Sequence, residues 1–200
     1  MQDSNFIYYK NTIAVTNRHL CTCPLTEQLK KVCSVHPRAI ILREKDLSED
    51  AYLQLARQCQ QAVESYGVPL IPNQYVAVAR ALQLKQIQVS FPLFADNYKS
   101  FTDFERVWVS VHSREEAWQA EQWGAGALIA GHIFATACKK DVAPRGLEFL
   151  QQICENVSIP VYAIGGINAK TYPLLQQSGV AGACVMSQSM TQENFFWQIG

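Results

Sequence analysis

The chain has 200 residues, in which 17 Lys and Arg balance 17 Asp and Glu. This length suits one domain spanning residues 1–200 and is at the short end for an eight-unit barrel. A chain without net charge has no global field that would favour nucleic acid or an anionic membrane as a partner. No apolar run approaches the roughly 20 residues that cross a bilayer, and the N-terminus lacks the pattern of a secretory signal. We therefore expect a cytoplasmic protein with no nucleic-acid or membrane partner.

A short apolar strand, a turn and an amphipathic helix alternate along the chain. Eight runs are predicted as strands: Thr12–Thr16, Ala39–Arg43, Val68–Ile71, Gln86–Ser90, Val107–Val111, Ala127–Ala130, Val161–Ile164 and Ala183–Met186. The clearest helices are expected at Ser48–Tyr66, Ser113–Trp123, Arg145–Asn156 and Ala169–Gln177. Eight is the number of strands that a closed parallel barrel needs, so we expect a single-domain (β/α)8 TIM barrel. An open doubly wound sheet is the alternative.

Capping signals support these helix ends. Ser48 is followed by two acids, and Ser113–Glu116 fits a capping box. A glycine follows three of the helical stretches, where a C-terminal cap requires positive φ: Gly67, Gly124 and Gly179.

Two units of the pattern are less regular. In the fourth, Phe91–Phe94 leads into a poorly periodic stretch, and whether residues 92–104 close over a site as a lid is left open. In the eighth, only Thr191–Ile199 is available for the last helix, which we expect to be short.

Two glycines, Gly165 and Gly166, close the seventh predicted strand. In (β/α)8 barrels, phosphate usually binds after strands seven and eight. Residues without Cβ let backbone N–H groups approach an anion, and the start of the following helix favours negative charge. Met186 and Ser187 end the eighth strand, where Ser187 can add an N–H and a hydroxyl. These residues predict a phosphate site, with an ordinary tight turn as the alternative.

His132 follows the sixth predicted strand, so we expect its side chain at the mouth of the barrel. An imidazole with an unperturbed pKa of about 6.5 can take and return a proton near neutral pH. The alternative is a histidine that is satisfied by a backbone carbonyl. We interpret His132 as the catalytic residue.

Other polar residues near strand ends are predicted to bind substrate. Arg43 and Lys45 lie at and just past the second strand, and either could hold a carboxylate. Asn73, after the third strand, can hydrogen-bond a ring nitrogen or a carboxylate. Lys139 lies in the loop after the sixth strand, and Ser110 belongs to the fifth.

The run Gly131–Arg145, together with Ile164–Ile167, resembles the thiamine phosphate synthase/TenI family of phosphate-binding (β/α)8 barrels. The resemblance is strongest from Val109 to Ser187 and is fainter, but in register, from Ile13 to Ser90. It implies that the ligand is a small phosphorylated thiazole. It also implies that Thr136 and Cys138 belong to the thiazole-phosphate side of the site.

The chain departs from the synthase pattern at three strand ends. The second strand of the synthases typically ends Gln-x-Arg-x-Lys, but Ile41 replaces the glutamine that reads the aminopyrimidine. The third typically ends Asn-Asp and the fourth supplies a further aspartate, whereas this chain has Gln74 and Leu93 there. Magnesium requires hard oxygen ligands, usually carboxylates. We therefore expect no metal, no other cofactor and no pyrophosphate displacement.

At the position of His132, the synthases usually carry proline and the TenI-type thiazole tautomerases carry histidine. The resemblance thus implies an isomerase that aromatises a carboxythiazole phosphate by proton transfer through His132. Two alternatives stay open: a non-catalytic, regulatory TenI-like protein that binds thiazole phosphates, and a divergent thiamine phosphate synthase. A homo-oligomer is also left open, because three tryptophans would suit a dimer face or would equally cover the outside of the barrel: Trp118, Trp123 and Trp197.

Overall fold

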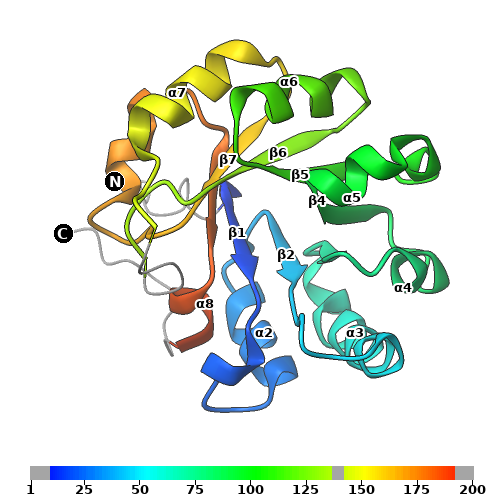
Figure 1. Ribbon diagram of the computed structural model, residues 1–200. Helices are drawn as coiled ribbons and strands as arrows, with labels where there is room; N and C mark the ends of the chain where they lie inside the picture. The colour runs from blue at the N-terminus through cyan, green and yellow to red at the C-terminus, as the bar shows by residue number, and fades with distance from the viewer. Residues whose placement is uncertain (1–9, 137–141, 192–200) are drawn as a thin grey trace. The chain divides into compact units, whose positions relative to one another are not determined.

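The computed structural model describes residues 10–136 and 142–191 (Figure 1). Its eight strands form one sheet in the order β3-β2-β1-β8-β7-β6-β5-β4. The pairs β1–β2, β2–β3, β5–β6, β6–β7 and β7–β8 are all parallel. Parallel strands joined by helical crossovers, with β1 next to β8, are the arrangement of a (β/α)8 fold. The predicted fold class is confirmed.

All eight predicted strands are present, with ends that differ from the prediction by no more than two residues. They are β1 (Thr12–Val15), β2 (Ala39–Leu42), β3 (Leu70–Pro72), β4 (Gln86–Ser90), β5 (Arg106–Val111), β6 (Ala127–Gly131), β7 (Val161–Ile164) and β8 (Gly182–Val185).

The helices agree less closely with the prediction. The α-helices are α2 (Leu25–Cys33), α3 (Glu49–Val63), α4 (Val76–Ala81), α5 (Phe91–Asp96), α6 (Arg114–Gln122), α7 (Gly146–Asn156) and α8 (Ser187–Thr191). The 3-10 helices are η1 (Arg18–Leu20), η2 (Glu64–Tyr66), η3 (Tyr98–Phe101) and η5 (Tyr172–Gln177). Within the described residues, no helix has the length and apolar character needed to span a bilayer.

Contacts divide the chain into two compact units, residues 1–87 with 185–200 and residues 88–184. β4 and β8 run across this division. The expectation of a single domain stays a prediction.

In the first unit, β1, β2 and β3 lie side by side and are buried along their whole length. The register places Ala14 beside Ile40, and Ile40 beside Leu70. α2 and α3 pack against each other, and α3 also contacts β3 (Figure 1). Strands that are covered on both faces read as continuous apolar runs, which is why these strands show no polar alternation.

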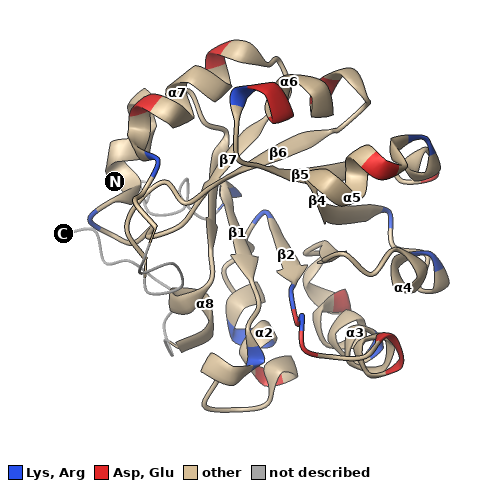
Figure 2. Ribbon diagram, viewed as in Figure 1, with Lys and Arg blue, Asp and Glu red and all other residues tan. Residues whose placement is uncertain are grey.

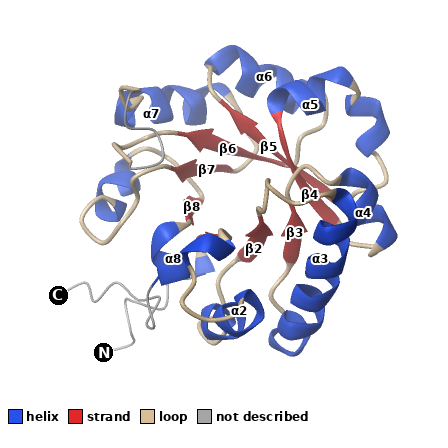
Figure 3. Ribbon diagram, turned by 60° about the horizontal axis from the view of Figure 1, so that its bottom comes forward, coloured by secondary structure: helices blue, strands red, loops and turns tan. Residues whose placement is uncertain are grey.

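In the second unit, β6 pairs with both β5 and β7, so that Leu128 lies between Val109 and Val161. α5, α6 and α7 lie side by side along these strands (Figure 3). The rings of Trp108 and Tyr162 meet edge to face with their centroids 5.1 Å apart, and both side chains are buried. This packing fixes the strands whose C-terminal ends carry His132 and the two glycines.

Charged residues lie mainly on the helices and loops (Figure 2). Within the eight strands, Arg106 at the start of β5 is the sole Lys, Arg, Asp or Glu. The charges that could serve a site therefore come from the residues just beyond the strand ends.

The predicted caps are present. The side chains of Ser48 and Ser113 accept hydrogen bonds from Ala51 N and Glu116 N at the starts of α3 and α6. The Glu116 carboxylate, however, accepts from His112 N rather than from Ser113 N, so the capping box is not reciprocal. The three predicted capping glycines all have positive φ: Gly67, Gly124 and Gly179.

One helix prediction was wrong. The stretch expected to be α-helical from residue 169 forms a 3-10 helix that begins at Tyr172, because a turn at Asn168–Thr171 uses the preceding backbone groups. The structure describes a short helix, α8, at Ser187–Thr191, whereas the last helix expected at Thr191–Ile199 lies, apart from Thr191, outside the described residues and stays a prediction. The irregular fourth unit contains a short helix and a 3-10 turn, α5 and η3, over residues 91–101.

Candidate functional site

The turn after β7 packs closely on the loop after β6, within the second unit. Ile133 N and Phe134 N donate to the carbonyls of Ile164 and Gly165 at 3.2 and 3.0 Å. A Cβ at Gly165 would lie 2.8 Å from the Cα of His132. These contacts leave no room for a larger residue than glycine at position 165.

Gly166 is constrained in the same way and by its conformation. It has φ 65°, and a Cβ there would overlap the Ala135 carbonyl oxygen and lie 2.8 Å from Phe134 Cβ. Its own carbonyl accepts hydrogen bonds from Thr171 Oγ1 at 2.9 Å and Asn168 Nδ2 at 3.3 Å. The orientation of this turn is therefore fixed from both sides.

Two backbone donors of this turn are available. The amides of Gly166 and Ile167 make no hydrogen bond to another described residue. Consecutive N–H groups beside a glycine form a concave site that suits an oxyanion. The expected help from a helix dipole is absent, because η5 begins only at Tyr172 and has 3-10 geometry.

His132 lies at the end of β6, as predicted, and its side chain is buried, with 4% of the residue exposed. It adopts φ 62°, a left-handed conformation that is uncommon outside glycine. Its carbonyl accepts from Arg145 N at 2.8 Å, but its Nε2 has no hydrogen-bond partner among the described residues. Among the described residues, every other buried side-chain nitrogen or oxygen has a hydrogen-bond partner. A buried, unpaired ring nitrogen costs about 1–3 kcal/mol, which a bound partner would recover.

The remaining predicted residues of this unit are less informative. Ser110 in β5 accepts a hydrogen bond from Gln88 Nε2 at 2.8 Å, so its hydroxyl is tied to β4. Thr136 is half-buried just beyond the Ala135 carbonyl. Cys138 and Lys139 lie outside the described residues.

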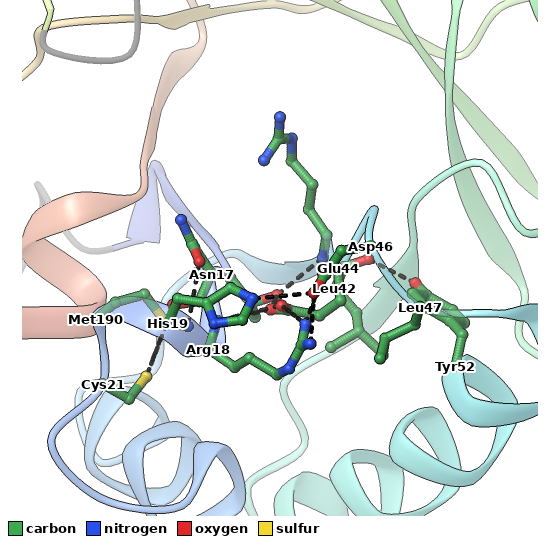
Figure 4. A network of polar contacts seen from close by, with 12 residues as sticks. Asn17, Arg18, His19, Cys21, Leu42, Glu44, Asp46, Leu47, Tyr52 and Met190 are labelled. Atoms are coloured by element: carbon green, nitrogen blue, oxygen red, sulfur yellow. Dashed lines mark hydrogen bonds and ion pairs between the residues drawn. The ribbon is translucent and has the colours of Figure 1, made fainter.

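In the first unit, the ends of β1 and β2 carry a network of ion pairs that the sequence did not predict (Figure 4). Glu44, with 2% exposed area, accepts from the Thr16 hydroxyl at 2.7 Å and from Arg18 N at 3.0 Å. Arg18 Nη1 pairs with Glu44 at 3.0 Å, and the same guanidinium grips both carboxylate oxygens of Asp46 at 2.7 and 2.6 Å. His19 Nε2 lies 3.0 Å from Asp46.

The bidentate ion pair between Arg18 and Asp46 shifts the pKa values of both groups. The hydrogen bond with Asp46 raises the pKa of the Arg18 guanidinium above its usual value. The hydrogen bond with Arg18 likewise holds the pKa of the Asp46 carboxyl well below its usual range. Both groups are therefore charged throughout the neutral range, and Arg18 is fully engaged with acids.

The predicted binding residues of β2 and β3 lie directly beside this network. The amide of Arg43 donates to Thr16 Oγ1 at 2.8 Å, and its half-buried guanidinium has no partner among the described residues. Lys45 is exposed. Asn73 is buried, and its amide donates to the hydroxyl of Tyr52 at 3.0 Å, which itself donates to the Leu42 carbonyl at 2.5 Å.

Met186 and Ser187, the last predicted residues, follow β8. Met186 is half-buried, and Ser187 is exposed and forms the first residue of α8. The carbonyl of Ser187 accepts from Thr191 Oγ1 at 2.8 Å, which leaves its own amide and hydroxyl as the groups that could meet a ligand.

The residues at the ends of β3 and β4 do not fit the magnesium site that the resemblance implies. Gln74 has φ 70° and no carboxylate, and residues 90–93 contain no acid. Among the described residues, no group of three or more His, Cys, Asp and Glu side chains is placed to hold a metal ion.

Comparison with known proteins assigns the family. The family model described as thiamine monophosphate synthase matches residues 12–188, which is nearly the whole of the described chain. The chain belongs to the thiamine monophosphate synthase family. Thiamine-phosphate synthase from Syntrophomonas wolfei is 32% identical over 173 residues, covering 83% of this chain and 81% of that protein. Thiamine-phosphate synthase from Desulfitobacterium hafniense is 36% identical over 157 residues, covering 76% and 75%.

A solved structure agrees with this assignment. Thiamine phosphate pyrophosphorylase from Pyrococcus furiosus superposes with a TM-score of 0.80 at 29% identity, covering 94% of this chain and 92% of that one. These relatives are synthases, which form thiamine phosphate. The expectation of a thiazole tautomerase was therefore wrong, and the family supports an enzyme without supporting an isomerase. Histidine rather than proline at position 132, together with Gln74 and Leu93 in place of the expected acids, misled the interpretation.

Sequence reasoning also missed the residues that organise the β1 and β2 ends in this synthase family member. Thr16, Arg18 and Glu44 meet although 26 to 28 residues separate the partners along the chain. The available signal was Glu44 itself, an acid between two cations directly after a buried strand. A carboxylate in such a position is rarely buried unless it is paired.

Proposed function

We propose that the chain is a thiamine-phosphate synthase, a transferase that joins an aminopyrimidine to a thiazole phosphate as the pyrimidine's bond to pyrophosphate breaks. The relatives of 32% and 36% identity that carry this name support the proposal. Of the chain's own features, the turn at Gly165–Gly166 supports it most directly, since this turn offers what a phosphate ester needs.

In this proposal, the amides of Gly166 and Ile167 bind the phosphate of the thiazole. The hydrogen bonds from Asn168 and Thr171 to the Gly166 carbonyl hold the turn in place before the ligand arrives. A donor site that is already oriented does not pay for ordering on binding, so it binds more tightly than a mobile loop. Ser187, Met186, Thr136, Cys138 and Lys139 remain proposed as further residues of the thiazole-phosphate side.

His132 binds the ligand in this proposal, and it is not a proton shuttle. Its unpaired Nε2 is buried at the end of β6, next to the glycine turn that its own backbone contacts. A polar ligand atom that reaches Nε2 would relieve an unmade hydrogen bond, which favours the bound state.

Arg43, Lys45 and Asn73 are proposed to bind the pyrimidine pyrophosphate. The guanidinium of Arg43 has no partner among the described residues and matches the geometry of phosphate oxygens. Ser110 is proposed as an additional polar contact. Because Gln74 and Leu93 replace the expected acids, the leaving pyrophosphate depends on cationic side chains of the chain itself.

The test is to incubate the purified chain with the aminopyrimidine pyrophosphate and the thiazole phosphate, and to measure thiamine phosphate and pyrophosphate by mass spectrometry. We expect both products in equal amounts, with and without added magnesium. Thiazole phosphate binding without product under either condition would overturn the proposal and would show that Gln74 and Leu93 have abolished the transfer step.

A further inference from the structure

The carboxylate of Glu44 is buried at the end of β2, where a charge is costly. Its side chain is 1% exposed, and removing a carboxylate from water costs several kcal/mol unless hydrogen bonds and a counter-charge replace the solvent. Both of its oxygens are occupied: Oε1 accepts from Thr16 Oγ1 and Arg18 N, and Oε2 accepts from Arg18 N and Nη1. These four hydrogen bonds satisfy both oxygens of the buried carboxylate.

Thr16 connects this carboxylate to Arg43. Its hydroxyl carries one proton, which it donates to Glu44 at 2.7 Å, so the oxygen is left to accept from the Arg43 amide at 2.8 Å. Thr16 is completely buried, and water therefore does not compete for either contact. The peptide plane that precedes the Arg43 side chain is thus fixed by Glu44 acting through Thr16.

Arg18 and Arg43, the two arginines of this region, have different partners. Arg18 is held by two acids, Glu44 and Asp46, through Nη1 and Nη2. Arg43 makes no ion pair with a described residue, although the next residue in the chain is Glu44. Because Arg18 and Thr16 take the acceptor positions of that carboxylate, Glu44 does not neutralise its neighbour.

We propose that Thr16, Arg18 and Glu44 are positioning residues for Arg43: they fix its backbone and occupy the adjacent acid, so that its guanidinium binds the pyrophosphate group of the substrate. This inference rests on the proposed function for the choice of ligand. The three residues themselves do not touch the substrate. Replacing any of them should therefore change the affinity of Arg43 for an anion that offers it at least two phosphate oxygens.

The experiment measures binding of inorganic pyrophosphate by calorimetry in four variants: Thr16→Val, Thr16→Ser, Arg43→Gln and the double variant Thr16→Val/Arg43→Gln. Valine keeps the shape of threonine without its hydroxyl, and serine keeps the hydroxyl. We expect Thr16→Val to weaken binding about tenfold and Thr16→Ser to stay within about twofold of the wild type. The double variant should bind no more weakly than Arg43→Gln alone, because the hydroxyl acts only through that side chain.

Ser48→Ala provides the matched control, since it removes another hydroxyl that caps the backbone of the same unit. It should lower the melting temperature and leave pyrophosphate binding unchanged. Glu44→Gln gives a second route if Thr16→Val folds poorly. It removes a negative charge, which by charge alone would tighten anion binding, whereas the positioning role predicts weaker binding.

The outcomes separate this inference from the proposed function. The positioning role would be overturned if Thr16→Val weakened pyrophosphate binding equally in the wild-type and Arg43→Gln backgrounds. Tighter pyrophosphate binding by Glu44→Gln, or no pyrophosphate binding by the wild type, would also overturn it. Arg43-dependent binding that needs the Thr16 hydroxyl, in a chain that forms no thiamine phosphate, would support the positioning role while the proposed function fails.

Discussion

The C-terminal ends of β1 and β2 and those of β6 and β7 are built in opposite ways. The first region uses charged side chains, with Glu44 and Asp46 saturating Arg18. The second uses backbone, with the Gly165–Gly166 turn packed on the loop that follows His132. A network of side-chain ion pairs is disrupted when one partner is removed, but it tolerates an extra atom next to the backbone. A tightly packed glycine turn has no side chain to lose but is disrupted by an added Cβ. The first region should therefore respond to removal of charged side chains, and the second to replacement of glycine.

The largest effect is expected from adding one methyl group to the glycine turn. Gly166→Ala should lower the free energy of unfolding by about 3 kcal/mol or more, since φ 65° costs alanine about 1–2 kcal/mol and its Cβ would overlap the Ala135 carbonyl oxygen. Thiazole phosphate binding should be lost with it. Urea denaturation and calorimetry measure the two effects.

Gly67→Ala is the matched control for this substitution. Gly67 also has φ 65°, but a Cβ there would meet no atom within 4 Å. It should cost only the conformational share, about 1–2 kcal/mol, with binding unchanged. Equal costs at the two glycines would show that the turn after β7 has room to spare and would remove the contrast between the two regions.

A smaller effect of mixed sign is expected at His132. His132→Phe removes the buried Nε2 that has no partner, so the free energy of unfolding should rise by about 1 kcal/mol. Thiazole phosphate binding should weaken about tenfold, because the ligand loses its partner. His36→Phe is the control: His36 has a similar φ of 53° but is exposed, so neither quantity should change. A loss of stability in His132→Phe would argue that the imidazole is satisfied in the free protein.

The smallest effect concerns pH and the side-chain network. Because Arg18 lowers the pKa of Asp46 in the folded state, this carboxylate contributes stability above its unfolded pKa of about 3.9 and loses that contribution as pH falls toward the lower folded value. Asp46→Asn should therefore be less stable than the wild type at pH 7, and the gap should narrow below pH of about 4. Asp96→Asn, which removes an exposed acid that forms no ion pair with a described residue, should show no such gap. A gap that is constant from pH 7 to pH 2 would contradict the ion pair.

The strands were predictable because their signal is local. Runs such as Val161–Ile164 are apolar throughout and are bounded by turn residues, so both ends were placed correctly. Helices α3 and α6 were equally visible, since Ser48 and Ser113 cap them. Helices α2 and α4 were not among the clearest predicted helices. Their N-cap residues, Pro24 and Tyr75, make no side-chain cap, so nothing local marks their starts.

In the candidate sites, too, local features could be predicted and long-range contacts could not. The glycine turn after β7 could be predicted, since two adjacent glycines at a strand end are visible in the sequence. The role of Asn168 and Thr171 in fixing its carbonyl, and the grip of Arg18 on Glu44, depend on which side chains the fold brings together. The interpretation of His132 failed for a different reason: its position was right, but a buried imidazole is compatible with binding as well as with proton transfer.

The hydroxyl of Tyr52 has a consequence for how the protein opens. It joins the Leu42 carbonyl to the Asn73 amide, and burial raises its pKa, so it stays protonated and keeps both contacts. Tyr52 belongs to α3 and stacks on Tyr75, with ring centroids 3.9 Å apart. The Asn73 amide also donates directly to the Leu42 carbonyl at 3.1 Å, so its proton can exchange with solvent only when both α3 and the end of β3 separate from β2. Its exchange rate reports the free energy of that local opening, and this amide should exchange as slowly as those inside β2.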